Sequence, residues 1–321
     1  MKLRSQLAIM ISIGLVSFGI SAAIAAPVQF ISLATGGTGG TYFILGGGMA
    51  KLIEKYVPNV KVSVESTAAT IENIRLVGAK KVQFAIVMPD GAYFGYHGGR
   101  EFKENKYPNL RSVMAGHASP MHFFVKANSG IKSLADVKGK RIAIAPPGSA
   151  ARFLAESTLE AYGLTPKDYK PFFLSHAEQA SAMQDGTIDM GCIFAGAPTA
   201  AVLDLATTQD IIFLSVGPEE MKKVLKAHPY CREFVIKAGT YKGQNAPVKT
   251  FSTPSIIITH AEVDPELVYG VSKAILEHTP ELKEIHPTGA EYTLADAADG
   301  VAIPLHPGAA KYLTEKGVLR K

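Results

Sequence analysis

The sequence predicts an α/β fold built from largely parallel sheets. Apolar, β-branched runs alternate along the chain with amphipathic runs whose apolar residues recur at helical spacing. The segments between successive apolar runs are long enough to hold a helix, which a connection between parallel strands requires. About 295 residues remain once an N-terminal leader is set aside, and this length is enough for two packed lobes.

The elements follow from these runs in chain order. Strands are predicted at Gln29 to Ala34, Lys61 to Glu65, Phe84 to Met88, Lys140 to Ala145, Ile188 to Phe194 and Ile211 to Val216. Helices are predicted over Leu45 to Val57, from Ala151 to Tyr162, from Pro265 to His278 and at the C-terminus, with Phe251 to Thr259 as a further apolar segment.

The chain is expected to cross between two lobes twice. We place the crossings near His117 to Pro120 and near Val216 to Pro218. Lobe 1 then comprises residues 27–118 plus 217–321, and lobe 2 comprises residues 119–216.

The N-terminus has the parts of a secretory signal. Lys2 and Arg4 precede an apolar run from Leu7 to Ile20, and Ala23-Ile24-Ala25 forms a cleavage site of the A-x-A type. Residues 1–26 are therefore predicted to be a cleaved signal peptide. An uncleaved membrane anchor is the alternative, although the apolar run is at the short end for a spanning helix.

Charge and cysteine content narrow the function classes. Removing Lys2 and Arg4 lowers the net charge from +5 to +3, and the remaining excess is spread without a block of like charge, so we expect no nucleic-acid partner. A mild positive charge favours encounters with small anions. The exported compartment permits a disulfide between Cys192 and Cys231. We favour two unpaired thiols, because these residues fall in different predicted lobes or at their border.

A glycine-rich junction follows the first predicted strand. Residues 35–42 read Thr-Gly-Gly-Thr-Gly-Gly-Thr-Tyr and lead into a helix whose first N–H groups lack intrahelical partners. This pattern predicts an anion cradle. It is neither a Walker loop nor a dinucleotide fingerprint, because no Gly-Lys-Ser/Thr follows and Tyr42 stands in place of the third glycine. A ligand-free glycine turn is the alternative.

Two more strand-to-helix junctions carry small hydroxyl residues. Ser66-Thr67 follows the second strand, and Pro146-Pro147-Gly148-Ser149 precedes a helix with Arg152 in its first turn. Arg152 there can clamp a carboxylate with two parallel bonds, or it can be a solvated helix residue. Asp90, after the third strand, is predicted either to contact the ligand or to serve a turn. Together the junctions predict one site shared by two lobes.

No motif indicates metal, cofactor or catalytic chemistry. The sequence contains no H-E-x-x-H, no histidine pair at i, i+4, no C-x-x-C and no G-x-S-x-G. We therefore expect no metal, no cofactor and no enzymatic activity. An exported hydrolase or transferase with the same cleft, and a binding protein that serves as a sensor input, remain alternatives.

The chain resembles the TAXI family, the extracytoplasmic solute receptors of tripartite ATP-independent periplasmic (TRAP) transporters. The resemblance covers nearly the whole mature chain and is carried by several motifs. They are residues 35–42, Ser66-Thr67 with Glu72-Asn73, residues 129–148 (SGIKSLADVKGKRIAIAPPG), Gly186-x-Ile188-Asp189, Gly196-x-Pro198 and residues 303–309 (IPLHPGA).

The resemblance implies a two-lobed periplasmic-binding-protein fold of type II, each lobe a mostly parallel sheet flanked by helices, with a cleft between the lobes. It implies a periplasmic protein that binds a small carboxylate solute, such as glutamate or a dicarboxylate, and delivers it to a TRAP-type permease driven by an ion gradient. We expect a monomer. The candidate ligand-binding residues are Thr35, Gly36, Gly37, Thr38, Gly39, Gly40, Thr41, Tyr42, Ser66, Thr67, Asp90, Ser149, Ala150, Arg152, Gly196 and Pro198.

Two departures from the family pattern predict a less polar pocket and an altered solute. After Ser149 this chain continues Ala150-Ala151-Arg152 where the family has Gly-Thr-Arg. Before Asp90 it has Met88-Pro89 where the family often has a glutamine and a serine.

Overall fold

The computed structural model describes residues 27–319, and the predicted signal peptide, residues 1–26, lies outside the described residues. Each of the six predicted strands is confirmed. The strands are β1 (Gln29–Ala34), β2 (Val60–Glu65), β3 (Phe84–Val87), β4 (Leu110–Lys126), β5 (Arg141–Ile144), β6 (Lys170–Phe173), β7 (Met190–Phe194), β8 (Ile211–Phe213), β9 (Arg232–Ile236) and β10 (Val248–His260).

Helices connect most of the strands. They are α1 (Thr41–Tyr56), α2 (Thr70–Gly78), α3 (Pro89–His97), α4 (Ala151–Ala161), α5 (His176–Gln184), α6 (Ala200–Thr208), α7 (Pro218–Ala227), α8 (Pro265–Glu277), α9 (Thr279–Ile285) and α10 (Pro307–Glu315). Three short 3-10 helices are η1 (Arg100–Phe102), η2 (Leu134–Val137) and η3 (Pro287–Glu291). Local chemistry sets several starts: Pro265 opens α8, and the Asp264 side chain caps it by accepting from Glu266 N.

The sheet has two parallel parts joined by long antiparallel strands. Strand order is β2-β1-β3-β10-β4-β7-β5-β6. The pairs of β1 with β2 and β3 are parallel, as are the pairs of β5 with β6 and β7. Between them β10 and β4 run antiparallel to each other and to their outer neighbours. The prediction of largely parallel sheets therefore holds within each lobe, whereas the connection between lobes is antiparallel.

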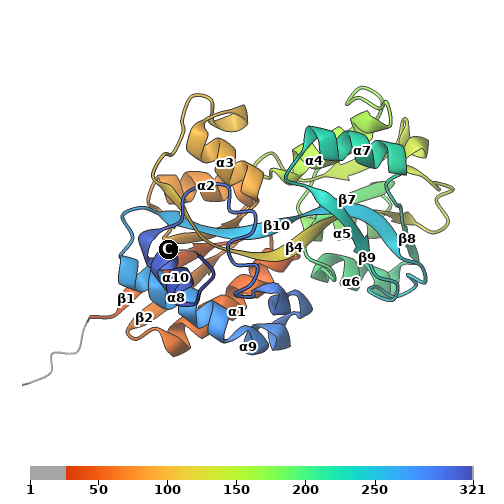
Figure 1. Ribbon diagram of the computed structural model, residues 1–321. Coiled ribbons are helices and arrows are strands. Elements are labelled where there is room, and N and C mark those ends of the chain that lie inside the picture. Colours follow the sequence, from red (N-terminus) through yellow and green to blue (C-terminus); the bar gives the residue numbers. More distant parts are fainter. Residues whose placement is uncertain (1–26, 320–321) are drawn as a thin grey trace, which may run out of the picture.

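Figure 1 shows two bodies that β4 and β10 bridge. We call the body with α1, α2, α3, α8, α9 and α10 the first lobe, and the body with α4, α5, α6 and α7 the second lobe. The predicted border at His117 to Pro120 falls within the continuous strand β4. The predicted boundaries at residues 118 and 216 stay predictions. Helix α7, which follows residue 216, packs against α4, and Lys223 Nζ donates to Ala161 O at 2.9 Å.

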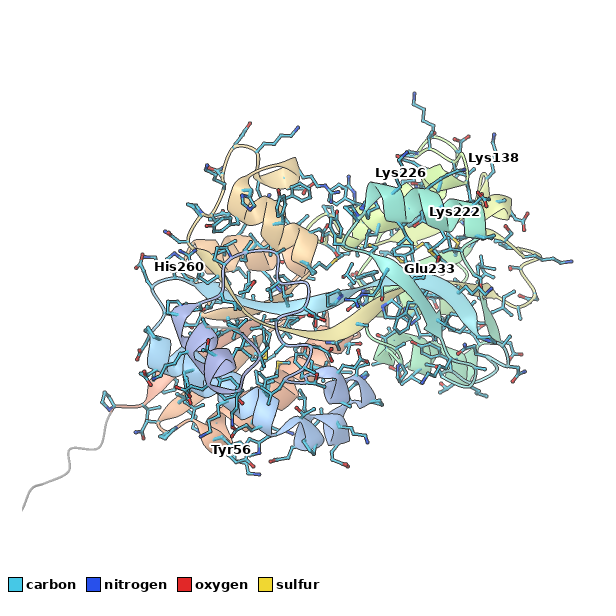
Figure 2. The ribbon with its side chains drawn as sticks, in the orientation of Figure 1. Tyr56, Lys138, Lys222, Lys226, Glu233 and His260 are labelled. Carbon is cyan, nitrogen blue, oxygen red and sulfur yellow. The ribbon has the colours of Figure 1, made fainter. Side chains whose placement is uncertain are left out.

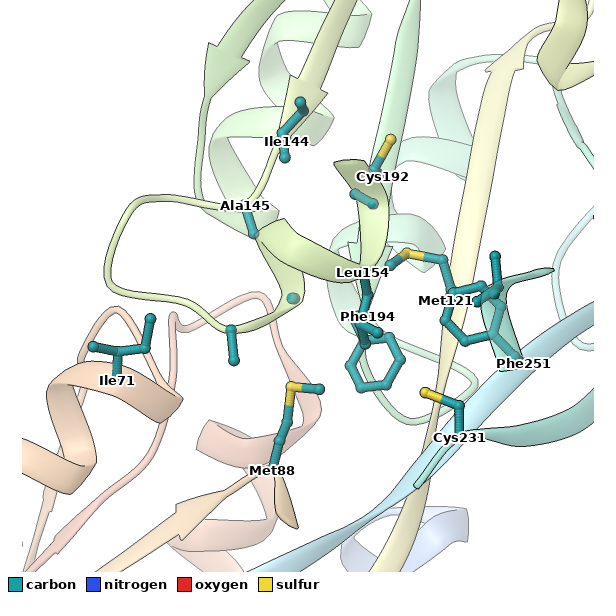
Figure 3. Packing of buried hydrophobic residues seen from close by; sticks show 14 of the residues in the cluster. Ile71, Met88, Met121, Ile144, Ala145, Leu154, Cys192, Phe194, Cys231 and Phe251 are labelled. Carbon is teal, nitrogen blue, oxygen red and sulfur yellow. The ribbon is translucent and has the colours of Figure 1, made fainter. Parts of the chain in front are cut away.

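A single apolar cluster extends from one lobe into the other. Ile71 and Met88 of the first lobe belong to the same buried cluster as Leu154 and Phe194 of the second. Figure 3 shows the loop after Ala145 arching toward the helix that carries Ile71. Burial of this apolar surface favours contact between the lobes.

Several further features bear on earlier expectations. Cys192 and Cys231 are buried free thiols, in agreement with the favoured alternative, and burial raises the pKa of both.

Lys138, Lys222 and Lys226 lie on the surface of the second lobe (Figure 2). No helix within residues 27–319 has the length and hydropathy needed to span a bilayer.

Candidate functional site

A cavity of about 380 Å³ lies where the two lobes meet. Both lobes supply its walls. The first lobe contributes Gly36, Gly37, Thr38, Gly40, Thr41, Tyr42, Ser66, Thr67, Ala68, Ala69, Thr70 and Met88. The second lobe contributes Pro146, Ser149, Ala151, Ser175, His176, Glu178, Phe194 and Ala195. This volume is at the small end of ligand pockets and suits a small solute such as an amino acid.

Four helices begin in the cavity wall. The first residues of α1, α2, α4 and α5 are Thr41, Thr70, Ala151 and His176, and all four line the cavity. The first turn of each helix has N–H groups without intrahelical acceptors, and the helix dipole adds positive potential there. In α2, Ile71 N and Glu72 N already donate to Gly148 O, and in α4, Ala151 N and Arg152 N donate to Ser149. The main-chain donors that can hold a negatively charged group therefore come chiefly from α1 and α5.

The lining carries little side-chain charge. Of the described residues that line the cavity, Glu178 is the only acid and none is Lys or Arg. Glu178 lies at the exposed rim, where its Oε2 accepts from Ser175 N at 2.7 Å, and hydrogen bonds from Ser175 lower its pKa. An anion in the cavity thus depends on N–H groups and hydroxyls for compensation.

Most hydroxyls of the first lobe brace the wall. Thr35 Oγ1 donates to Glu65 O at 2.8 Å, and Ser66 Oγ donates to Gly36 O at 3.1 Å. Thr67 Oγ1 bonds Asn73 Oδ1 at 2.6 Å. These bonds tie residues 35–36 to residues 65–67, and so fix the loop from which the first-turn N–H groups of α1 project.

His176 is a lining residue that the sequence did not single out. Its Nδ1 is buried without a partner, and burial lowers the pKa of His176 to about 4. The ring is therefore neutral at neutral pH and can offer a ligand one donor or one acceptor. A signal was present in the sequence, because Ser175-His176-Ala177-Glu178 has the S-x-x-E pattern of a capping box directly after a strand, and both of its bonds form.

The structure brings together most of the predicted binding residues. Gly36, Gly37, Thr38, Gly40, Thr41, Tyr42, Ser66, Thr67 and Ser149 line the cavity, whereas Thr35, Gly39, Asp90, Ala150, Arg152, Gly196 and Pro198 do not. Met88 and Ala151, which belong to the two departures from the TAXI pattern, both line it. Whether the lining residues bind a solute stays a prediction.

Arg152 is held away from the cavity. Its Nε donates to Glu156 Oε1 at 3.1 Å, and its guanidinium lies 5.4 Å from the ring centroid of Phe153 and 5.5 Å from that of Phe173. The predicted clamp on a carboxylate would require the guanidinium to leave this partner and these rings.

Asp90 is engaged with a second arginine. Its side chain is 2 % exposed, and Oδ2 accepts from Arg100 Nη1 at 3.2 Å. Arg100 Nη2 in turn donates to Tyr230 OH at 3.0 Å. Burial raises the pKa of Asp90, while Arg100 opposes that shift. Asp90 is thus paired with Arg100 outside the cavity lining, while its Oδ1 is buried without a partner, and its role toward a solute stays a prediction.

Gly196 and Pro198 serve contacts between the lobes through their carbonyl groups. Thr41 Oγ1 donates to Gly196 O at 3.0 Å, and His286 Nε2 lies 2.7 Å from Pro198 O. Among residues 27–319, no group of three or more His, Cys, Asp or Glu side chains is arranged to hold a metal.

Comparison with known proteins gives the family and the fold. Residues 33–317 match the NMT1-like family. PhnD1 from Prochlorococcus marinus, solved with methylphosphonate, is 11 % identical with a TM-score of 0.58, and the match covers 91 % of this chain and 99 % of that one. The alkanesulfonate-binding protein SsuA from Xanthomonas axonopodis pv. citri, bound to MOPS, is 17 % identical with a TM-score of 0.50, covering 92 % and 96 %.

The periplasmic aliphatic sulphonate binding protein SsuA from Escherichia coli is 18 % identical with a TM-score of 0.50, and the match covers 89 % of this chain and 78 % of that one. At these identities the likeness establishes the fold alone. The fold is that of the two-lobed periplasmic binding proteins, as the sequence predicted.

Proposed function

The chain belongs to the NMT1-like family, and from the geometry of its cleft we propose that it is an extracytoplasmic solute receptor. It binds a small carboxylate-bearing solute between the lobes and releases it unchanged. The observation that carries this proposal is the convergence of four helix N-termini on one cavity of about 380 Å³.

Main-chain donors supply enough energy for such binding. Micromolar affinity corresponds to about 8 kcal/mol. Hydrogen bonds to a charged group contribute roughly 1.5 to 3 kcal/mol each when water is excluded. A few bonds from the first turns of α1 and α5 therefore suffice without a cationic side chain, because Ile71 N and Glu72 N of α2 already donate to Gly148 O.

The side chains that line the rest of the cavity favour one class of carboxylate solute over another. Met88 and Phe194 make part of the cavity apolar, and Glu178, in the first turn of α5, places a carboxylate at the rim. A second carboxylate of the solute would face repulsion there, whereas an ammonium group would be attracted. These features favour an amino acid over a dicarboxylate, and Met88 with Ala151 favours a less polar solute than the TAXI pattern would bind.

The proposed partner is a membrane permease of the TRAP type, driven by an ion gradient. The motifs shared with the TAXI family support this partner, and the predicted signal peptide supports a periplasmic location for a monomeric receptor. Reconstitution of the permease in proteoliposomes tests it: uptake should require this protein and an ion gradient and should not require ATP.

A thermal-shift panel tests the binding class. The panel contains L-glutamate, L-glutamine, L-leucine, succinate, methanesulfonate and methylphosphonate. Ligands that bind only the native state raise the apparent melting temperature, so we expect an amino acid to do so. A shift with only methanesulfonate or methylphosphonate would replace the carboxylate by another anion. Mass spectrometry should recover the bound solute unaltered, and turnover would support an enzyme instead.

A further inference from the structure

Four glycines lie where one lobe touches the other. A β-carbon added to Gly148 of the second lobe would lie 2.7 Å from Ala68 Cβ of the first, and one added to Gly196 would lie 2.9 Å from Thr41 Cγ2. In the first lobe, a β-carbon on Gly40 would lie 2.7 Å from His176 Nδ1, and one on Gly39 would lie 3.1 Å from Ala177 N. The separations below 3.0 Å at Gly148, Gly196 and Gly40 are too short for non-bonded heavy atoms, and the 3.1 Å separation at Gly39 is tight.

The backbone at these four positions does not itself require glycine. None of the four belongs to the glycines with positive φ in the described chain, and Gly40 has φ −104° and ψ 157°, which any residue adopts. Each lobe would therefore accept alanine at its own glycines. The opposite lobe is what leaves no room for the β-carbon.

Main-chain carbonyls at three of these glycines also bond across the cleft. Gly148 O accepts from Ile71 N at 3.0 Å, in the first turn of α2. Gly39 O accepts from Thr199 Oγ1 at 3.0 Å and from Ala201 N at 3.1 Å. Gly196 O accepts from Thr41 Oγ1 at 3.0 Å. Close approach thus brings a hydrogen bond at each of these places, and a side chain there would prevent it.

We infer that Gly39, Gly40, Gly148 and Gly196 form a closure surface whose partner is the other lobe of the same chain. Part of the glycine-rich loop therefore serves lobe contact and not the anion. The inference rests on the proposed function only in that closure is the step that encloses the solute.

A disulfide reporter measures closure without any solute. A β-carbon at Gly37 would lie 3.7 Å from Ser175 Cβ, across the cleft. The two β-carbons of a disulfide lie about 3.5 to 4.5 Å apart, so a bond can form between cysteines at these positions. The variant with Gly37→Cys and Ser175→Cys should form this bond under mild oxidation when the lobes touch. The native thiols Cys192 and Cys231 are buried and sit elsewhere.

Gly148→Ala in the reporter background is the decisive change, because Ala68 Cβ has no rotamer by which to move away. We expect the rate of disulfide formation to fall at least tenfold, with a melting temperature within about 3 °C of the reporter's, a shift that corresponds to less than about 1 kcal/mol. Adding Ala68→Gly should restore the rate, since it empties the same space. Gly47→Ala, on α1 with no atom within 4 Å of the added carbon, is the matched control and should leave the rate unchanged.

An unchanged rate in the Gly148→Ala variant would overturn the inference. So would slow trapping accompanied by a large loss of thermal stability that Ala68→Gly does not repair, because the glycine would then serve its own lobe. The assay contains no solute, so it can succeed even if every member of the thermal-shift panel fails to bind. Conversely, a solute can bind while the closure surface is disproved.

Discussion

The strand-to-helix junctions at residues 35–42 and 146–152, called here the first and the second junction, look alike in sequence but have different surroundings. Residues 35–42 line the cavity almost throughout, while residues 146–152 contribute only Pro146, Ser149 and Ala151. The hydroxyl of Thr41 reaches across to the second lobe, whereas that of Ser149 accepts from Ala151 N within its own turn. The shared pattern of strand, small residues and helix therefore predicts position at the cleft, but not what each side chain does there.

The difference arises from the residues that each junction contacts. Thr199, which bonds Gly39 of the first junction, donates its own N–H to Tyr241 OH at 3.0 Å, and that hydroxyl lies 2.8 Å from His122 Nε2. A buried chain of polar groups in the second lobe thus supports the first junction. Arg152 of the second junction bonds Glu156 on its own helix instead.

The largest expected effect is a loss of unfolding free energy at acid pH, because protonation of His122 disrupts the buried chain of polar groups behind the first junction. Burial lowers the pKa of His122 to about 4, below its ordinary 6.5, so between these values the unfolded chain binds a proton that the native state refuses. Stability is therefore complete above about pH 6.5 and falls as the pH drops toward 4. At pH 5 a shift of this size costs on the order of 2 kcal/mol.

His122→Gln should reduce the loss of unfolding free energy between pH 7.5 and pH 5 by about that amount, measured by urea denaturation at both values. The exposed His97 on α3 provides the control, and His97→Gln should leave the difference unchanged. Equal pH dependence in wild type and the His122 variant would contradict the proposed role of burial.

Thr41→Val should have the next largest effect. The two side chains have similar shape, but the change leaves Gly196 O without the donor that now lies 3.0 Å away. An unpaired buried carbonyl costs about 1 to 3 kcal/mol, so solute affinity should fall roughly tenfold by calorimetry with the solute that the panel identifies. Ser149→Ala, which removes no bond between lobes, should change affinity less than about threefold. Equal losses would erase the distinction between the junctions.

Arg152→Ala should have the smallest effect. Its ion pair with Glu156 is a partly exposed i, i+4 pair, which contributes about 0.3 to 0.5 kcal/mol. We expect affinity for a carboxylate to change less than about threefold, in the same calorimetric experiment. A loss of tenfold or more would restore the sequence-based prediction that Arg152 clamps the solute.

Much of the fold followed from the sequence because local patterns determine it. The β-branched runs became strands, and the glycine loop and Ser66-Thr67 met at one cavity because carboxyl ends of parallel strands share one edge of a sheet. The sequence predicts a border at His117 to Pro120, where the segment Val113 to Gly116 gives way to the apolar run His122 to Val125, but the structure has β4 (Leu110–Lys126) running through it. Pairing with β10 and β7 makes it one continuous strand, and sequence alone does not reveal those partners.

The site was less predictable than the fold for a physical reason. Arg152 was assigned to the solute because its position in a first turn permits that contact, but Glu156 one turn later competes for the same guanidinium. The Arg152–Glu156 pair at i, i+4 is therefore a local pattern that competes with the predicted contact to the solute. The S-x-x-E pattern at Ser175 marks the start of α5, but the position of His176 opposite Gly40 depends on a residue far away in the chain. The residue that lies opposite His176 is set by the tertiary structure, which local patterns do not contain.

The bonds that join the lobes at Gly39, Gly148 and Gly196 end on backbone oxygens, and Thr41 is the one donor among them whose side chain lines the cavity. Ala68 aside, apolar wall residues such as Met88, Phe194 and Ala195 are therefore free to be exchanged for others of similar size. If the lobes close as proposed, the scaffold is suited to redesign as a biosensor, in which a new recognition surface keeps lobe closure as its readout.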